Sequence, residues 1–232
     1  MMAVSPGPGP DGPESTMEKM LRSVSATQPG VRPSPSESIQ RLPDGSTIIT
    51  AKPIMCDSFL AYGQVIGIPE SGSILEEQTK PVSANQGSAR KYPNVAAYDT
   101  APQDRHPSNT MISIFVSKPR TEAPGQFDLH VMERHPYSSQ LFIPMGVKEE
   151  EGFRYLVAVS PPGDPKPIID NVEVFLVHGK QGISYGAGTW HAPIVVLGKE
   201  DVQFAVVVDT NGNPQDDTEE VEIKEKATVV IP

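Results

Sequence analysis

The sequence predicts a mainly β fold, an antiparallel sandwich or barrel with one or two short helices and a disordered N-terminal arm. Short runs rich in Val, Ile, Phe and Tyr are broken by Pro and Gly at close intervals, which is typical of antiparallel strands joined by turns. The chain has 232 residues, of which 37% are hydrophobic, and this is enough apolar material for one core. We therefore expect one compact domain with polar extensions.

The two ends of the chain differ in composition from its middle. Residues 1–45 are rich in Pro, Gly and Ser and contain no aromatic residue, so they cannot bury enough surface to offset the entropy of ordering, and we expect a disordered arm. Residues 211–232 carry six acidic side chains up to Glu225, and we expect an acidic tail that is a solvated strand edge or loop. The predicted domain is the stretch between them, residues 46–210.

Strands are predicted from the apolar runs in this domain. Their expected ranges are 48–54, 64–68, 94–98, 111–117, 127–134, 140–143, 155–160, 182–185, 193–197 and 202–208.

Helices are predicted at two places. Over 170–178, Asp170 can cap the first turn, Glu173 completes a capping-box-like pair and Gly179 ends the helix. A shorter helix is expected over 57–62, with Gly63 as its stop. The polar stretches 70–88 and 147–152 are expected to be insertions in the scaffold.

Charge and cysteine content exclude several classes of function. Lys and Arg number 19 and Asp and Glu number 29, so the net charge of −10 repels phosphate backbones and anionic lipids. We expect no nucleic-acid partner and no membrane partner. The single Cys56 cannot close an internal disulfide, and no run of apolar residues is long enough to span a membrane. The expected location is the cytoplasm.

The first stretch with chemical potential surrounds His135. Because strand side chains alternate between faces, Glu133 and His135 should share one face, while His130 and Arg134 should lie on the other. Gln140 begins the next apolar run, which gives the spacing Glu-x-His-x4-Gln, and Gly146 follows. Two metal-binding side chains should therefore point inward together.

The second stretch ends at His191. Gly188 suits a tight turn with positive φ, and His191 follows as the chain enters a strand. The two stretches together resemble the paired cupin motifs, with Glu133, Gln140 and Gly186 standing where that pattern has His, Glu and Pro.

Longer strings carry a more specific resemblance. Ala61-Tyr62-Gly63-Gln64-Val65-Ile66, the segment 133–144 and the segment 182–193 occur in the order found in the ureidoglycolate lyase family, formerly called ureidoglycolate hydrolase. The resemblance covers roughly residues 57–210. It implies a cupin-type antiparallel barrel, a homodimer, and conversion of ureidoglycolate to glyoxylate and urea in allantoin and purine degradation.

The resemblance also implies roles for particular residues and a divalent metal, nickel among the candidates. The expected catalytic residues are His191, His135 and Glu133. The expected substrate-binding residues are Gln140, Tyr185 and Tyr92. The expected metal ligands are Glu133, His135, Gln140 and His191. A metal-free site using the same side chains stays open, because Gln is a weak ligand.

Other interpretations are open at this point. His191 could be a satisfied structural histidine, Gln140 a buried structural amide, and Glu133 with His135 part of a surface ion pair. Two histidines and a carboxylate also match an oxygen-activating iron site. A barrel that binds small acids without catalysis, and a hydrolase that releases ammonia and carbon dioxide instead of urea, are further alternatives.

Overall fold

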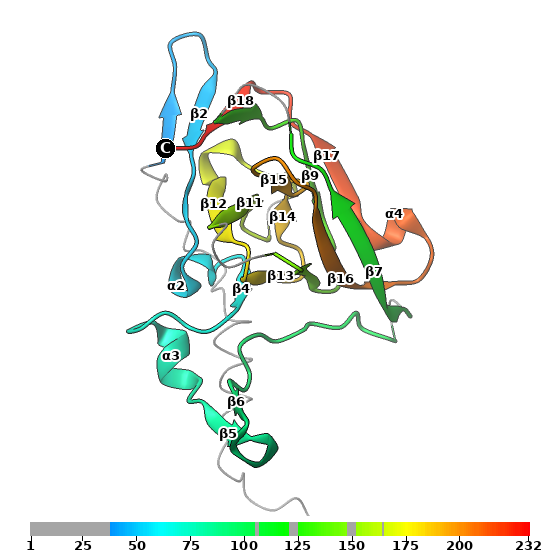
Figure 1. Ribbon diagram of the computed structural model, residues 1–232. Helices are drawn as coiled ribbons and strands as arrows, with labels where there is room; N and C mark the ends of the chain where they lie inside the picture. The colour runs from blue at the N-terminus through cyan, green and yellow to red at the C-terminus, as the bar shows by residue number, and fades with distance from the viewer. Residues whose placement is uncertain (1–37, 105–106, 121–124, 148–151, 164) are drawn as a thin grey trace, which may run out of the picture. The chain divides into compact units, whose positions relative to one another are not determined.

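The computed structural model describes residues 38–104, 107–120, 125–147, 152–163 and 165–232 (Figure 1). Most of the predicted arm and residues 148–151 of one predicted insertion lie outside the described residues. The mainly β prediction is confirmed. The strands form open sheets that pack on one another and are not closed into a barrel.

A seven-stranded sheet lies at the centre of the domain. Its order is β17 (Glu219–Glu222), β9 (Val131–Arg134), β14 (Trp190–His191), β11 (Phe153–Ser160), β12 (Glu173–His178) and β3 (Lys52–Pro53), with β15 (Val195–Val196) also paired to β11. Alternate residues of β11 are buried on opposite faces: Tyr155, Val157 and Val159 belong to one apolar cluster, Leu156 and Ala158 to another. Both faces of this sheet are therefore covered.

A five-stranded antiparallel sheet covers one face. Its order is β4 (Gly63–Ile66), β13 (Gly182–Tyr185), β10 (Gln140–Met145), β16 (Val202–Thr210) and β7 (Asn109–Ser117), the long green arrow beside β16 in Figure 1. Phe142, Tyr185 and Phe204 from this sheet pack with Tyr155 and Phe175 of the central sheet. We call the space between these two sheets the main core.

A four-stranded sheet covers the other face, with the order β1 (Ile39–Arg41), β2 (Thr47–Thr50), β18 (Ala227–Val230) and β8 (Gln126–Asp128). Trp190 is fully buried in the second apolar cluster on this side. The segment that we expected to be a tail thus supplies two strands, since β18 lies between β2 and β8 and β17 pairs with β9. Residues 38–45, assigned to the arm from sequence, likewise contain β1.

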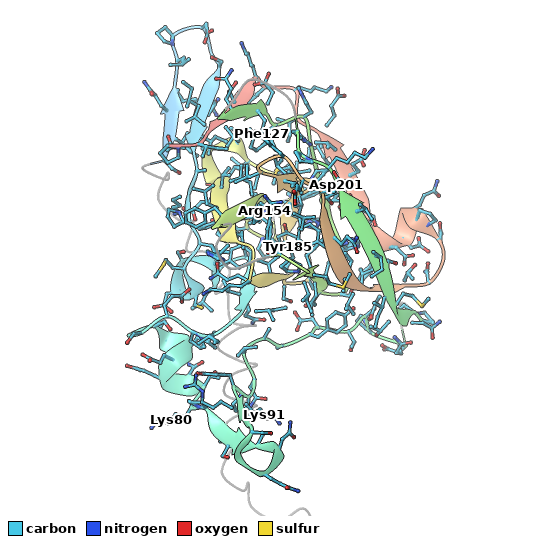
Figure 2. The ribbon with its side chains drawn as sticks, viewed as in Figure 1. Lys80, Lys91, Phe127, Arg154, Tyr185 and Asp201 are labelled. Carbon is cyan, nitrogen blue, oxygen red and sulfur yellow. The ribbon has the colours of Figure 1, made fainter. Side chains whose placement is uncertain are left out.

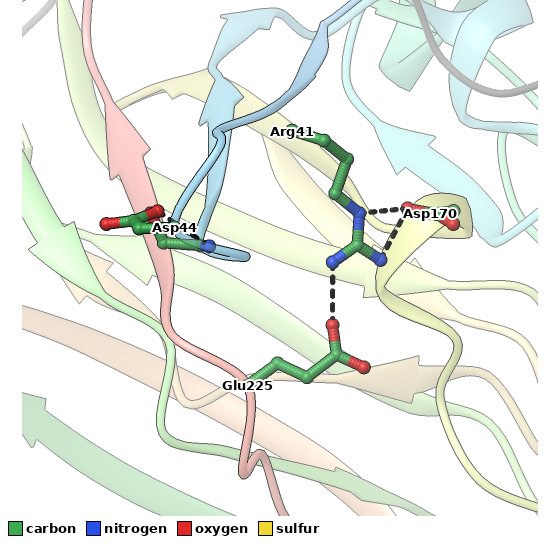
Figure 3. Close-up of polar contacts among 5 residues, drawn as sticks. Arg41, Asp44, Asp170 and Glu225 are labelled. Carbon is green, nitrogen blue, oxygen red and sulfur yellow. Dashed lines mark hydrogen bonds and ion pairs between the residues drawn. The ribbon is translucent and has the colours of Figure 1, made fainter.

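An exposed ionic cluster ties β1 to two distant loops. Arg41 contacts Asp170 at 2.7 Å and Glu225 at 2.8 Å (Figure 3). All three side chains are substantially exposed, so we expect the cluster to contribute at most about 1 kcal/mol to stability.

The helix predicted over 170–178 is wrong. The structure has a 3-10 turn, η3 (Ile169–Asn171), followed by strand β12, which lies between β11 and the edge strand β3. A short apolar run buried on both faces cannot be told from a helix by periodicity, and here its β-branched and aromatic residues favour the strand. Glu173 caps no helix and instead contacts Lys52 at 2.9 Å.

The strand predicted over 94–98 is also wrong, because this segment is irregular and is held by side chains. The amide of Ala97 donates to Gln64, and the Tyr98 hydroxyl and the Ala101 amide donate to the buried carboxylate of Asp209. Side-chain acceptors thus replace the backbone partners of a strand.

The remaining elements are short. Helix α2 (Cys56–Phe59) confirms the helix predicted over 57–62, although it ends three residues earlier than expected, and helix α4 (Pro214–Asp217) precedes β17. The predicted insertion 70–88 contains helix α3 (Ile74–Gln78), strand β5 (Val82–Ala84) and η1 (Asn85–Gly87); β5 pairs with β6 (Ala89–Lys91), and Figure 2 labels Lys80 and Lys91 in this part. No helix among the described residues is long and apolar enough to cross a membrane.

Candidate active site

Glu133, His135 and His191 meet at one point beside the main core. Glu133 on β9 is the direct antiparallel partner of His191 on β14, so the two side chains share a face, and His135 follows two residues later with the same alternation. One ligand atom from each of the three residues lies within 4.8 Å of those of the other two. The two sequence stretches therefore converge as predicted.

Backbone carbonyls determine which nitrogen of each imidazole carries the proton. His135 Nδ1 lies 2.9 Å from the carbonyl of Asp217, and His191 Nδ1 lies 2.9 Å from the carbonyl of Thr189. A carbonyl can only accept, so both Nδ1 atoms donate, and each neutral ring presents a bare Nε2. Both Nε2 atoms are buried and have no hydrogen-bond partner among the described residues.

The three groups form a cluster of acceptors that requires a positive charge. His191 Nε2 lies 3.5 Å from Glu133 Oε1. A hydrogen bond from a protonated His191 Nε2 lowers the pKa of Glu133 below its usual value, and burial opposes this shift. When His191 is neutral, its bare Nε2 and the carboxylate oxygen are two acceptors that repel each other. A proton or a metal cation at this point turns the repulsion into attraction.

His135 is held in its neutral form. Burial lowers its pKa below the usual 6.5, and the nearby His191 lowers it further. His135 therefore stays neutral at neutral pH and keeps its Nε2 lone pair available to a ligand.

Tyr185 lies directly against this cluster. Its ring is parallel to the His191 ring, with 4.1 Å between ring centroids and 11° between planes, and Figure 2 shows it amid the packed side chains. Its hydroxyl is buried and has no hydrogen-bond partner among the described residues. Burial raises the pKa of this hydroxyl well above its usual value, so it stays protonated and can donate.

The other two residues expected to bind substrate are Gln140, which pairs with Tyr185 across two strands, and Tyr92, which follows β6. Gln140 is the cross-strand partner of Tyr185, so it lies on the same face, and its buried Oε1 also has no partner among the described residues. Tyr92 is half-buried and follows β6. The roles of Gln140, Tyr185 and Tyr92 stay predictions.

Arg134 lies on the opposite face of β9 from the cluster. Its guanidinium stacks over the Trp190 ring at 4.5 Å and contacts Glu219 at 2.6 Å. The alternation of the strand predicted this face, and Arg134 covers Trp190, the residue that precedes His191.

Sequence reasoning missed the carbonyl groups of Thr189 and Asp217. Their contribution comes from the backbone, which every residue possesses, so no residue type marks them in a sequence.

The residues fit a divalent cation. Two imidazole nitrogens and one carboxylate oxygen suit zinc, nickel, iron or copper, and both histidines donate their other nitrogen to a backbone carbonyl, as histidine ligands do. The same lone pairs could instead hold and transfer a proton.

Known proteins resemble this chain over the region that contains the site. The model of the Ureidoglycolate lyase family matches residues 46–230. The chain is 34% identical to the ureidoglycolate lyase of Azotobacter vinelandii over 73% of this chain and 90% of the relative. It is 33% identical to the ureidoglycolate lyase of Saccharomyces cerevisiae, over 69% of this chain and 85% of the relative. It is 36% identical to that of Pseudomonas aeruginosa, over 70% of this chain and 83% of the relative. The family match includes β17 and β18.

Proposed function

The chain belongs to the ureidoglycolate lyase family, and from this premise we propose that it eliminates urea from ureidoglycolate to give glyoxylate. The observation that carries the proposal is the cluster of two bare imidazole nitrogens and one carboxylate within the region that matches the family. This cluster is where the reaction takes place.

The chemistry needs one proton to move. Ureidoglycolate carries a hydroxyl, a carboxylate and a ureido nitrogen on one carbon. When the hydroxyl loses its proton, the oxygen electrons form the carbonyl of glyoxylate, and the C–N bond breaks with its electron pair on nitrogen. That nitrogen takes up one proton and leaves as urea. The atoms balance without an oxidant, a reductant or a covalent intermediate.

His191 is suited to move this proton. Its Nδ1 donates to the Thr189 carbonyl, so Nε2 is free to accept the hydroxyl proton and then return it to the leaving nitrogen. Glu133, 3.5 Å away, stabilises the imidazolium that forms in between. The stacked Tyr185 ring holds the imidazole in place and excludes water.

The unpartnered buried groups are complementary to the substrate. The Gln140 Oε1 accepts from a ureido N–H, and the Tyr185 hydroxyl donates to the carboxylate. Tyr92 is proposed as a further substrate contact. The Gln140 and Tyr185 groups, which have no partner among the described residues of the free protein, gain one when the substrate binds.

A divalent cation, nickel or a similar ion, is part of the proposal. Glu133, His135 and His191 would hold it, with Gln140 as a weaker fourth ligand. A bound cation would hold the substrate's carboxylate and hydroxyl oxygens and lower the pKa of the hydroxyl. One lone pair cannot bind a metal and accept a proton at the same time. The metal content of active protein therefore decides whether His191 binds a metal or accepts the substrate's proton.

Product analysis tests the proposal. Purified full-length protein is incubated with ureidoglycolate, with and without added Ni²⁺, Zn²⁺ or Mn²⁺, and urea, glyoxylate, ammonia and oxygen are measured. We expect equal amounts of urea and glyoxylate, in the setting of purine-nitrogen salvage. Ammonia and carbon dioxide in place of urea, oxygen consumption, or binding without turnover would each refute the lyase assignment.

The protein is further proposed to be a homodimer that pairs through β7. This nine-residue strand ends the five-stranded sheet, and its sequence has no charge and no Pro. Ile112, Ile114 and Val116 on its outer side are 72%, 56% and 56% exposed. By contrast, the edge strand β17 carries three glutamates, which discourage pairing.

A second copy is the occupant that β7 fits best. Antiparallel pairing centred on Ser113 sets Ile112 against the partner's Ile114 and Met111 against the partner's Phe115, with Val116 opposite the partner's Thr110, and a two-fold axis satisfies both strands at once.

Light scattering during size exclusion tests the pairing. We expect a dimer for the wild type and for Ile68→Lys, an exposed control site outside β7, and a monomer for Ile114→Lys. A monomeric wild type, or a dimeric Ile114→Lys, contradicts the pairing.

A cytoplasmic location is also proposed. It is supported by the single buried Cys56, whose burial raises the pKa of its thiol to about 12 and keeps it unreactive.

A further inference from the structure

The loop between β16 and β17 reaches back to the cluster of Glu133, His135 and His191. Residues 211–218 contain helix α4, and the carbonyl of Asp217 at its end accepts the hydrogen bond from His135 Nδ1. Glu219, two residues later, is paired with Arg134, the residue before His135. The acidic C-terminal segment is therefore in direct contact with the backbone and the side chain that form the site.

The side chain of Asp217 anchors this carbonyl. Its Oδ1 accepts from the amide of Asn211 at 2.9 Å, and its Oδ2 accepts from the Thr210 hydroxyl and, at 3.3 Å, from the amide of Gly212. The Asp217 amide donates to the Asn213 carbonyl at 3.0 Å. Both carboxylate oxygens thus tie Asp217 to the end of β16, and its carbonyl has little freedom to leave His135.

Asp216 provides an internal comparison. It occupies the same helix turn, but its carboxylate accepts only from the side-chain amides of Asn211 and Asn213, at 3.3 and 2.9 Å. Its side chain is exposed, and within the described part of the chain its hydrogen bonds go to Asn211 and Asn213 and not to the site residues. Substituting each of the two neighbouring aspartates therefore distinguishes a general loss of loop stability from a specific effect on the site.

We propose that Asp217 is a positioning residue, whose carboxylate holds its own carbonyl against His135 Nδ1 and thereby keeps the His135 Nε2 bare and directed at Glu133 and His191. Without that acceptor, the neutral imidazole is free to carry its proton on Nε2, which removes the lone pair from the site. Thr218 Oγ1 is 3.4 Å from Nδ1 and is the weaker of the two contacts. The effect on turnover rests on the proposed function, whereas the effect on the tautomer does not.

Nitrogen NMR of the imidazoles tests the proposal. The full chain is labelled with ¹⁵N-histidine, and two-bond ¹H–¹⁵N spectra at fixed pH show which nitrogen of each ring carries the proton; His135→Gln assigns the His135 signals. We expect Nδ1–H for His135 in the wild type and in Asp216→Ala. In Asp217→Ala we expect a mixture of tautomers. In Thr218→Val we expect the wild-type pattern.

Kinetics and metal titration extend the test. Loss of such an outer hydrogen-bond partner lowers metal affinity or activity by about 10–100-fold. We expect this loss in kcat and in Ni²⁺ affinity for Asp217→Ala, with KM nearly unchanged, and none for Asp216→Ala. Asp217→Asn should recover part of it, because one amide oxygen can still accept from Asn211.

Several results would overturn the proposal. One is a folded Asp217→Ala that keeps Nδ1–H on His135 and wild-type kcat; another is an equal loss in Asp216→Ala. If Asp217→Ala does not fold, Thr210→Val removes one of the anchors, and an unchanged His135 signal in that variant is equally contradictory. A wild type without lyase activity whose His135 tautomer still depends on Asp217 would refute the function and leave the positioning role standing.

Discussion

Removing the hydroxyl of Tyr185 should make the protein more stable and less active. This hydroxyl is buried beside His191 and has no hydrogen-bond partner among the described residues of the free protein. Mutational data place the cost of burying such an unpaired polar group at about 1–3 kcal/mol. Tyr185→Phe keeps the ring that stacks on His191 and removes this cost, so we expect a gain of about 1–3 kcal/mol.

Tyr155→Phe is the matched control. Tyr155 is equally buried in the main core, but its hydroxyl donates to the Gln181 carbonyl at 2.6 Å. Removing it takes away a satisfied hydrogen bond and leaves the carbonyl without its partner, so we expect a loss of about 1–2 kcal/mol. The two Tyr→Phe changes delete the same atom in one core and should shift stability in opposite directions.

Thermal unfolding and steady-state kinetics measure both effects. A gain of 1 kcal/mol corresponds to a rise in Tm of about 2–4 °C for a chain of this size. The hydrogen bond that Tyr185 donates to the substrate's carboxylate should be worth about 10–100-fold in kcat/KM, and Tyr155→Phe should leave kcat/KM unchanged. A Tyr185→Phe variant that loses stability as Tyr155→Phe does would refute the reasoning, because the hydroxyl would then have a partner in the free protein.

Three further predictions concern the scaffold and the site. Asp209→Ala removes the acceptor of three hydrogen bonds, from Tyr98, Thr110 and the Ala101 amide, and should cost about 3 kcal/mol or more in urea unfolding; a loss below about 1 kcal/mol would contradict this. Gly63→Ala would place a Cβ against the Ser184 carbonyl at φ +149° and should cost about 2–4 kcal/mol, whereas Gly45→Ala, at φ +84° with open space around it, should cost about 1 kcal/mol. Because burial lowers the pKa of His135 in the folded state below 6.5, the unfolded chain binds more protons between the two pKa values, so stability should fall as pH drops below about 6.5. His135→Gln should lack that part of the pH dependence after chelator treatment, and identical pH profiles for the two proteins would argue against a depressed pKa.

The sequence was most informative where alternation along strands decided the outcome. Glu133 and His135 share a face because β9 runs without a bulge and its alternation continues to residue 135, and His191 meets them because β14 pairs with β9 at the expected turn. The same rule failed to separate a strand from a helix over 170–178, where both faces of β12 are buried and the apolar residues show no period of two.

Other features lay beyond any local pattern. Open sheets and closed barrels have the same strand signals, so the absence of closure could not be read from the apolar runs. The contribution of Asp217 passes through a backbone carbonyl more than 80 residues from His135, and its charged neighbours gave the segment the appearance of a solvated tail. The pairing of β17 with β9, which are far apart in the sequence, brings Asp217 to the site.

The most direct test of the central claim is the rate of glyoxylate release from ureidoglycolate by the wild type, His191→Ala and His178→Ala, with the metal content of each protein measured. His178, at the end of β12, contacts Phe153 and serves as the histidine control outside the cluster. We predict release by the wild type and by His178→Ala, and a loss of about 100-fold or more for His191→Ala. Wild-type protein that releases no glyoxylate with or without divalent metal, or a His191→Ala variant as active as the wild type, would contradict the account.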